Sequence, residues 1–482
     1  MKSPNRTTRR TFIKSAAAAG VTLAVGLPGC ATPGRKTSRK APAFVTKRQK
    51  LRIAFIGTGG MGGAHVDQIK RLEDEQHLGV VCPCYCDVDK NQWVRAEKAF
   101  PGAKPFQDYR EMIATAADSF DALMIGIPDH HHYPATILAM RAGKHVYTQK
   151  PLTHTPWEAR QLATAAKKYG VVTQMGNQGH SNNGNRKVYE WVRSGALGDV
   201  LETHTWTDRP VWPQGIARPK ESDPIPDNLD WDIWIGPAPE RPYKGPKSGT
   251  GNGPYHRFNW RGWWDFGAGA LGDMACHTWD SVNWSLDPGR PTSIEPLASA
   301  PVVPENAPPE RKETFPKASI VKWVFPANRW RPGFVAYWYD GHLKPPVPAV
   351  LAYGRRLPST GTLFVGTQAR LLVSGDYGER PRIIPDSKRK QIGDPPKMLE
   401  RSPGQMVEWI LACKGEKPVG YARSNFAYAG PFTETILLGN IALRVGQRLE
   451  WDGANMRFPN LPEADQYVSK EYRDGWDFRQ IS

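Results

Sequence analysis

The stretch Leu-Arg-Ile-Ala-Phe-Ile-Gly-Thr-Gly-Gly-Met-Gly, residues 51–62, decides the fold that we expect for this chain. An apolar run of strand length leads into the glycine-rich turn Gly57 to Gly62, and a helical pattern follows over residues 63–72. Such glycines allow a tight turn, a close approach of the backbone to a pyrophosphate and close packing of helix on strand. The stretch therefore predicts the opening of a dinucleotide-binding domain.

A second apolar segment, residues 78–86, ends at Asp87, 25 residues after Gly62. A carboxylate at this position holds a ribose 2′-hydroxyl in dinucleotide-binding folds and repels a 2′-phosphate. We therefore expect NAD rather than NADP, although Lys90 and Arg95 lie nearby. A glycine-rich turn without a ligand is the alternative, but strand, glycines, helix and acid follow one another in the required order.

Strand and helix patterns alternate as far as residue 178. This alternation predicts a parallel sheet with helices on both faces and with ligands at the carboxyl ends of its strands. The expected strands cover 122–127, 144–148 and 171–175, and the expected helices cover 89–100, 109–117, 133–142 and 157–169. The side chains at or just past the expected strand ends are Asp87, Asp129, His132, Lys150 and Asn177.

Residues 1–30 have the pattern of a Tat export signal. Arg9-Arg10 precede an apolar run over residues 16–27 that is too short to span a bilayer. A basic disordered terminus would explain the arginines but not the apolar run. Cys30 ends a lipobox-like Leu-Pro-Gly-Cys, so we expect either a membrane-anchored lipoprotein or, after ordinary cleavage nearby, a periplasmic protein.

The formal net charge of +17 suggests an anionic partner only until its distribution is considered. Residues 1–50 contribute twelve Lys or Arg and no acid, and residues 31–50 form a basic tether. A net charge of +5 remains for residues 51–482, which contain no helix-turn-helix, zinc-finger or RNA-binding signature. We therefore expect no nucleic-acid partner.

Neither the cysteines nor the three adjacent histidines predict a metal site. Cys82, Cys84 and Cys86 alternate along an expected strand and lack the spacing of zinc ligands. His130 to His132 follow a strand end on one loop, where adjacent side chains rarely converge on one ion. With no paired-cysteine framework, the fold depends on its core, which suits a protein that folds in the cytosol before export.

Beyond residue 178 the composition changes. Ten of the eighteen tryptophans fall between Trp191 and Trp284; besides packing in the core, such rings are platforms for sugars. Later apolar segments predict strands of an open, largely antiparallel sheet at 320–325, 334–339, 362–365 and 370–374, and a helix at 432–447. The expected division is a signal over 1–30, a tether over 31–50, a first domain over 51–178, a second domain over 179–458 and a tail over 459–482.

The segment Gly267 to His277 carries a candidate catalytic pair. If the chain is helical from Ala270 onward, Asp273 and His277 lie four residues apart on one helix face. The carboxylate would orient the imidazole and stabilise its charge once it accepts a proton. An Asp and a His at this spacing are more often a packing pair, but the neighbouring glycines and tryptophans favour a site.

Taken together, these motifs resemble the glucose–fructose oxidoreductase and inositol dehydrogenase family, called Gfo/Idh/MocA. The resemblance extends over nearly all of residues 51–450 and implies a Rossmann domain followed by an α/β domain whose open sheet faces the nicotinamide. It also implies dimers or tetramers through that sheet. Lys150 corresponds to the lysine of the family's Glu-Lys-Pro motif; the chain departs from the pattern at Gln149, where glutamate is usual, and at Asp129, where many members have asparagine.

Oxidation of a secondary alcohol requires a base and a cation at the same oxygen. We predict His277 as the base, Lys150 as the cation and Asp273 as the residue that orients the base or the substrate. The predicted contacts to NAD are Gly57, Gly59, Gly60, Met61, Gly62, Asp87, Asp129, His132, Gln149 and Lys150. The predicted contacts to a carbohydrate substrate are Asn177, Gln178, His180 and Trp264, and the alternative for the first three is a solvated loop.

The predicted export limits which NAD-dependent reactions we expect, because there is no obvious pool of soluble NAD outside the cytoplasm. We therefore expect a tightly held cofactor that travels with the folded protein and is reset on it. Three functions fit the sequence: an oxidoreductase acting on a sugar, polyol or glycoside; a redox-neutral, NAD-dependent glycosidase that passes through a keto-sugar; and an exported carbohydrate-binding protein without turnover. The joint presence of Lys150, Asp273 and His277 favours an enzyme.

Overall fold

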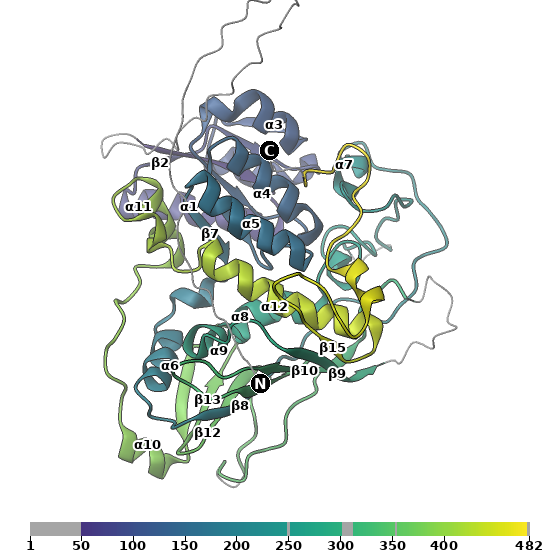
Figure 1. The fold of residues 1–482 in the computed structure, drawn as a ribbon. Helices are drawn as coiled ribbons and strands as arrows, with labels where there is room; N and C mark the ends of the chain where they lie inside the picture. The colour runs from purple at the N-terminus through teal and green to yellow at the C-terminus, as the bar shows by residue number, and fades with distance from the viewer. Residues whose placement is uncertain (1–49, 248–250, 301–311, 352–353, 480–482) are drawn as a thin grey trace, which may run out of the picture. The chain divides into compact units, whose positions relative to one another are not determined.

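The computed structural model describes residues 50–247, 251–300, 312–351 and 354–479, which all belong to one compact unit (Figure 1). The predicted Tat signal, Cys30 and nearly all of the predicted tether lie outside the described residues. Within the described ranges, no helix combines the length and the apolar character that crossing a bilayer requires.

The first domain is a parallel sheet with helices on both faces, as the alternating pattern predicts. Its strands lie in the order β4-β3-β1-β5-β6-β7, and β2 pairs with β1. Ile53 and Phe55 share a core with α1, whereas Ala54 and Ile56 share one with α3 to α5, because successive side chains of a strand point to opposite faces. The doubly wound Rossmann fold is therefore confirmed. Its elements are β1 (Leu51–Ile56), α1 (Gly60–Gln76), β2 (Val80–Val81), β3 (Cys84–Cys86), α2 (Val94–Ala99), β4 (Lys104–Phe106), α3 (Tyr109–Ala116), β5 (Ala122–Ile125), α4 (His132–Arg141), β6 (His145–Gln149), α5 (Pro156–Tyr169) and β7 (Thr173–Gly176).

Two predicted elements of this domain are interrupted. The strand expected over 78–86 is divided into β2 and β3, and Pro83 between them has no N–H for a strand ladder. The helix expected over 89–100 is a 3-10 turn, Lys90–Gln92, followed by the short helix α2. Strand β4 was not predicted because its three residues carry no apolar alternation.

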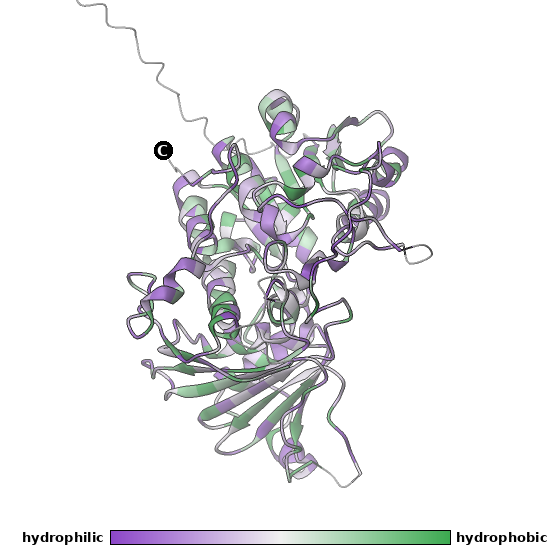
Figure 2. Cartoon of the chain, turned by 90° about the vertical axis from the view of Figure 1, so that its right-hand side faces the viewer, coloured by the Kyte–Doolittle hydropathy of each residue, from purple (hydrophilic) through white to green (hydrophobic). Residues whose placement is uncertain are grey.

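The second domain is an eight-stranded sheet in the order β14-β13-β12-β8-β11-β10-β9-β15. Its strand pairs in the described residues are antiparallel except β8 with β11. Along β10, Val321, Trp323 and Phe325 alternate with less buried residues and join the core of α8, α9 and α12. Figure 2 shows helices gathered over one face of this sheet, so the predicted open, mostly antiparallel sheet is confirmed. Its elements are α6 (Asn183–Arg193), β8 (Val200–Trp206), α7 (Trp231–Ile235), α8 (Gly269–Thr278), α9 (Asp280–Leu286), β9 (Ser293–Ala300), β10 (Ala318–Phe325), β11 (Phe334–Tyr339), β12 (Gly361–Gly366), β13 (Arg370–Ser374), β14 (Arg380–Ile384), α10 (Asp386–Ile392), α12 (Phe426–Val445) and β15 (Leu449–Glu450).

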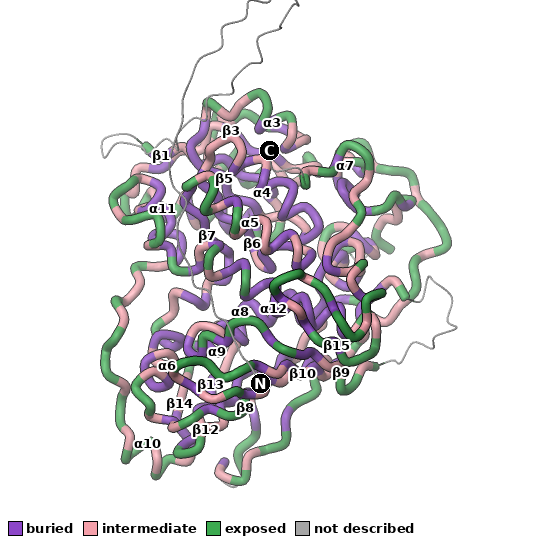
Figure 3. The backbone as a smooth tube through the Cα atoms, viewed as in Figure 1, coloured by how far each residue is buried: buried purple, intermediate pink, exposed green. Residues whose placement is uncertain are grey.

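Two late segments of the chain return to the first domain. Helix α11 (Gln405–Cys413) lies in the segment that the sequence assigns to the second domain, yet its Trp409 is fully buried in the core beside α1. In the predicted polar tail, Trp476 is buried against Tyr109 and His131, at ring-centroid distances of 6.0 and 5.4 Å. The buried parts of the tube in Figure 3 accordingly run from the first domain into the helices above the second sheet.

Most tryptophans of the Trp-rich segment are core residues. A separate apolar cluster holds Trp231, Trp234, Trp260 and Trp263, and the first two rings stack with their centroids 4.6 Å apart. This cluster supports the loops between β8 and α8. Its members Trp234 and Trp260 also border a cavity at the edge of the first domain.

Candidate functional site

The glycine turn after β1 contains close backbone contacts that are possible only because these residues have no side chain. Gly57 has a φ of +86°, and a Cβ there would lie 2.3 Å from the carbonyl oxygen of Gly126. A Cβ on Gly62 would lie 2.2 Å from the carbonyl oxygen of Gly57. Helix α1 therefore packs directly on the strand ends, as the glycine pattern predicts.

The first turn of α1 fits the negative charge of a dinucleotide pyrophosphate. It contains no acidic residue, and no side chain caps it, so its terminal N–H groups have no side-chain competitor for a phosphate. Asp87, at the end of β3, accepts hydrogen bonds from the backbone N–H of Thr58 at 2.8 Å and of Asp89 at 3.0 Å. Burial raises the pKa of the Asp87 carboxyl, and these two hydrogen bonds oppose the shift.

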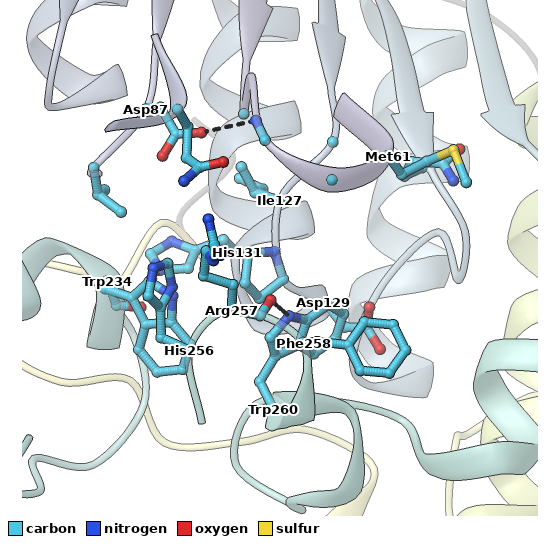
Figure 4. A pocket seen from close by; sticks show the side chains of 18 of the residues that line it. Met61, Asp87, Ile127, Asp129, His131, Trp234, His256, Arg257, Phe258 and Trp260 are labelled. Atoms are coloured by element: carbon cyan, nitrogen blue, oxygen red, sulfur yellow. Dashed lines mark hydrogen bonds between the residues drawn. The ribbon is translucent and has the colours of Figure 1, made fainter. Parts of the chain in front are cut away.

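A cavity of about 470 Å³ extends from the glycine turn to the start of the second domain (Figure 4). This size lies within the range of about 300–1,000 Å³ that is typical of small-molecule sites. The cavity brings together nine of the predicted site residues: Gly57, Gly59, Gly60, Met61, Asp87, Asp129, Gln149, Lys150 and Asp273. The predicted contacts from the glycine turn and from the catalytic group are thus parts of one space.

One wall of this cavity comes from a segment, residues 252–261, that sequence reasoning missed. Figure 4 shows His256, Arg257 and Phe258 across the cavity from the glycine turn. The His256 Nε2 lies 3.2 Å from Asp89 Oδ2, which ties this wall to the first domain. Burial alone would raise the pKa of Asp89, but hydrogen bonds from His256, Asn228 and Gln92 outweigh it and lower the pKa to about 2.

An ion pair joins the two domains at the far end of the cavity. Lys150, just after β6, donates from Nζ to Asp273 Oδ1 at 2.8 Å and to the Asp273 carbonyl oxygen at 2.8 Å. Arg261 donates from Nε to the same Oδ1 at 3.2 Å. Burial opposes ionisation of Asp273, but the two cations outweigh it and hold its pKa at about 2. Nothing in the local sequence around Arg261 indicated this role.

Asp129 lies near the same two cations as Asp273 but differs from it in protonation. It is fully buried and accepts a hydrogen bond from the backbone N–H of Ala268 at 3.0 Å. Burial first, and then the Asp273 carboxylate, raise the pKa of Asp129 to about 8, although Arg261 and Lys150 oppose the shift. At neutral pH the site therefore holds one charged and one protonated carboxyl group.

His277 lies one helical turn beyond Asp273 on α8, as predicted, but behind the cavity wall. No hydrogen bond joins the two side chains, and His277 Nδ1 has no partner among the described residues. The ring of Tyr377 meets it edge-on at a centroid distance of 4.8 Å. Burial first, and then the neighbouring Lys150, lower the pKa of His277 to about 3, so the ring is neutral.

The predicted substrate contacts after β7 lie in a closed network instead of along the cavity. Asn177 and His180 are buried and hydrogen-bond to Asp280, from Asn177 Nδ2 at 3.1 Å and from His180 Nδ1 at 3.0 Å. Tyr428 on α12 donates to the same carboxylate at 2.7 Å. Gln178 begins the short 3-10 turn between Asn177 and His180 and does not border the cavity either.

The adjacent histidines bond to backbone carbonyls. His130 contacts the carbonyl oxygens of Phe266 and Trp234, His131 shares that of Trp234, and His132 contacts those of Pro151 and Ile127. His132, a predicted cofactor contact, is therefore a buried link between strand ends and does not border the cavity. Trp264, a predicted substrate contact, packs against Phe315 with the two rings tilted and borders a second cavity.

Gln149, at the end of β6, borders the cavity beside Lys150 and is 5% exposed. A Cβ on Gly176 would lie 1.7 Å from Gln149 Oε1, so the absence of a side chain at Gly176 makes room for this amide. Gln149 is thus a packed neighbour of the ion pair and adds no charge to it.

Comparisons with known proteins agree with this architecture. A profile of the GFO_IDH_MocA oxidoreductase family, described as an NAD-binding Rossmann fold, matches residues 51–177, and the profile of the family's C-terminal alpha/beta domain matches residues 186–307. An inositol 2-dehydrogenase of Corynebacterium glutamicum is 27% identical over 154 residues, 32% of this chain and 44% of the relative. A glycosyl hydrolase family 109 protein of Shewanella sp. (strain ANA-3) is 28% identical over 209 residues, 40% of this chain and 44% of the relative. These matches span less than half the length of either relative.

Solved structures share the fold at low sequence identity. The WlbA dehydrogenase of Bordetella pertussis, solved with NADH and UDP-GlcNAcA, aligns with a TM-score of 0.56 and 18% identity over 84% of this chain and 98% of that one. A levoglucosan dehydrogenase, solved with NADH and levoglucosan, aligns with a TM-score of 0.52 and 17% identity over 83% of this chain and 99% of that one. At these identities the likeness establishes the fold.

Proposed function

The chain belongs to the Gfo/Idh/MocA oxidoreductase family, with that family's NAD-binding Rossmann domain, and on this premise we propose that it oxidises a secondary hydroxyl of a sugar, polyol or glycoside. One observation carries the proposal. The cavity that begins at the glycine turn ends at the Lys150–Asp273 ion pair, whose atoms are 2.8 Å apart. If a dinucleotide lies along the glycine-turn end of the cavity, Lys150 at the other end remains as a cationic donor for a substrate.

NAD, when bound, supplies the acceptor for the hydrogen that the substrate carbon loses. The residues that would hold it are the glycine turn for the pyrophosphate and Asp87 for a ribose hydroxyl. Lys150 Nζ then donates to the substrate oxygen and stabilises the negative charge that develops there. His277 is the proposed acceptor of the hydroxyl proton, and the nearby Asp273 carboxylate would stabilise the resulting imidazolium. Because its Nδ1 is buried and the residue does not border the cavity, the ring has to move toward the substrate before it can take the proton.

Tight retention of the cofactor is supported by the wall over residues 252–261. This segment of the second domain closes the cavity opposite the glycine turn and is held to the first domain by the His256–Asp89 contact. A wall fixed in this way limits the paths by which a dinucleotide could leave the cavity. Retention in turn suits a protein that the twin-arginine pattern at Arg9-Arg10 would export in folded form to the periplasm, with Cys30 as a lipid attachment point.

Redox-neutral glycoside cleavage is the second candidate, and the similarity to a glycosyl hydrolase family 109 protein favours it specifically. In that reaction, oxidation to a ketone acidifies the adjacent C–H bond, the aglycone is eliminated with that proton, water adds to the resulting unsaturated ketone, and the ketone is reduced again. It uses the same base and the same cation, but it breaks the glycosidic bond and returns the cofactor to its oxidised form.

An absorbance spectrum of the purified protein, with no cofactor added, tests both candidates. We expect co-purified dinucleotide whose absorbance near 340 nm rises lastingly when a sugar of the right class is mixed in. Release of an aryl aglycone without lasting reduction would replace this proposal by the redox-neutral one. Absence of bound dinucleotide together with no change on mixing would leave only a carbohydrate-binding protein.

A further inference from the structure

A second cavity of about 250 Å³ lies between the first domain, α12 and the C-terminal segment. It is separated from the cofactor cavity by one stretch of chain around Ala268. The N–H of Ala268 donates to Asp129 on the first side, whereas its carbonyl oxygen accepts from Asn440 Nδ2 at 2.9 Å on the second. The two cavities are therefore neighbours without being one site.

Two polar atoms at this second cavity have no partner in the described part of the chain. Asn440 is 7% exposed; its Nδ2 is bonded to Ala268, but its Oδ1 is buried and unpaired. The Oγ of Ser469, on the opposite lining segment, is also buried and unpaired. Because an unpaired buried polar atom destabilises a fold, two of them at one cavity indicate groups that a ligand completes. Both can accept a hydrogen bond from a hydroxyl.

One cation at the mouth of the cavity is also available. Arg444 is exposed there above the rings of Tyr467 and Trp264, at 4.3 and 5.3 Å from their centroids. Among the described residues it forms no ion pair; burial lowers its pKa, and the Tyr467 hydroxyl and the nearby Asp265 carboxylate partly oppose this. The other lining cation, Lys470, is occupied, since it lies 3.1 Å from Glu158 Oε1. Two acidic residues, Asp265 and Glu471, also line the cavity and would repel an anion. Asp265 is ion-paired with Arg241 and Glu471 is exposed to solvent, so the repulsion from both is weakened.

We propose that this second cavity binds a small sugar acid. The carboxylate meets the guanidinium of Arg444, whose planar fork matches it, and the hydroxyl groups donate to Asn440 Oδ1 and Ser469 Oγ. The volume of about 250 Å³ lies below the ~300 Å³ at which small-molecule sites usually begin, which limits the ligand to a single monosaccharide unit. The site is independent of the oxidation proposed above and needs no turnover to be detected.

Isothermal titration of the full chain with D-gluconate tests this site. We expect one binding event per chain, at least about tenfold tighter than that of D-glucose, because the neutral sugar lacks the charge-assisted bond. Arg444→Met should weaken gluconate binding about tenfold or more, whereas Arg448→Met, at an exposed arginine just past the end of α12, should not. Lys150→Met should leave gluconate binding intact, because Lys150 borders only the first cavity.

Ser469→Ala supplies a variant that does not depend on the folding of Arg444→Met. It removes a hydroxyl that has no partner in the described residues, so it should lower gluconate affinity without lowering the melting temperature. The proposal is overturned by any of three results: no gluconate binding at millimolar concentration, equal affinity for glucose, or loss of binding in Lys150→Met but not in Arg444→Met and Ser469→Ala. The last result would place the probe in the cofactor cavity.

Discussion

Two buried aspartates, seven residues apart on successive helices, have opposite surroundings. Asp273 on α8 meets Lys150 and Arg261 at the end of an open cavity. Asp280, the first residue of α9, meets Asn177, His180 and Tyr428, none of which borders that cavity. Both clusters combine an acid with a basic group from the ends of the Rossmann strands, yet only the first borders the cavity that begins at the glycine turn.

The difference shows that access, not residue type, separates a reactive cluster from a supporting one. The Asp280 cluster joins β7, α9 and α12 and fixes where α8 ends, so it acts on the reaction only through position. The Asp273 cluster holds Lys150 at the edge of the cavity, which both residues border. Disrupting the first should therefore cost stability, and disrupting the second should cost activity.

The largest effect is expected at Lys150. Lys150→Met should lower kcat about 10²- to 10³-fold, because a donor to developing negative charge is lost, while bound dinucleotide remains. Turnover and the spectrum of the purified variant measure the two halves of this statement. Lys167→Met, an exposed lysine on α5, is the matched control and should behave as the parent protein. Unchanged turnover in Lys150→Met would remove Lys150 from the mechanism.

Asp280→Asn should show the reverse pattern. It keeps the shape of the side chain but weakens three hydrogen bonds, two of them buried, so unfolding should become easier by about 2 kcal/mol. Denaturant unfolding followed by tryptophan fluorescence measures this change, with the exposed Asp287→Asn as control. A kcat loss as large as that of Lys150→Met, at unchanged stability, would erase the distinction between the two clusters.

The sequence predicted the site where short motifs lie on regular elements. The glycine turn, Asp87 and Lys150 all follow from one rule, that ligands gather at the carboxyl ends of parallel strands, and α8 places Asp273 and His277 one turn apart as their spacing requires. Burial could not be predicted in the same way. The period-2 or period-3.6 pattern does not say that Asn177 or His180 will be sealed beneath α12, because that depends on a helix some 250 residues later in the chain.

Contributions from long loops were missed for a related physical reason. The wall over residues 252–261 has no periodic pattern, and its Arg261 reaches Asp273 only because the Trp231 cluster fixes the loops around it. The buried Trp476 lies in a tail whose sequence is mostly polar. In both segments a few aromatic rings decide the position of the chain, and local sequence does not show which partners they meet.

Asp87 tests the opposite end of the same cavity. Asp87→Ala should weaken NAD binding by about 1–2 kcal/mol, because the acceptor for a ribose hydroxyl is lost. Equilibrium titration of protein freed of its dinucleotide measures the change, with the exposed Asp74→Ala on α1 as control. If NADP binding were to fall by as much as NAD binding, the role of Asp87 in choosing between the two cofactors would be wrong.

The smallest predicted effect concerns Asp129, which lies near the same cations as Asp273 but remains protonated. Its pKa is about 8 in the folded chain and about 3.9 in an unfolded one. Between these values the folded chain binds a proton that the unfolded chain has released, so stability falls as pH rises through this window and levels off above it. Asp129→Asn removes this contribution, which amounts to at most ~1.4 kcal/mol per pH unit.

Unfolding free energies measured between about pH 5 and pH 8 should therefore decline less steeply for Asp129→Asn than for the parent protein. Asp273→Asn tests the same charge from the other side. Because the pKa of Asp273 is lowered to about 2, its own stabilising charge is complete above about pH 4 and is lost only as pH falls through about 2. Between pH 5 and 8, Asp273→Asn should therefore act only through Asp129: it removes the charge that helps to raise the pKa of Asp129, so the slope should become less steep than in the parent protein. Equal slopes for the parent and Asp129→Asn would mean that Asp129 is charged at neutral pH, and that both carboxylates share the two cations.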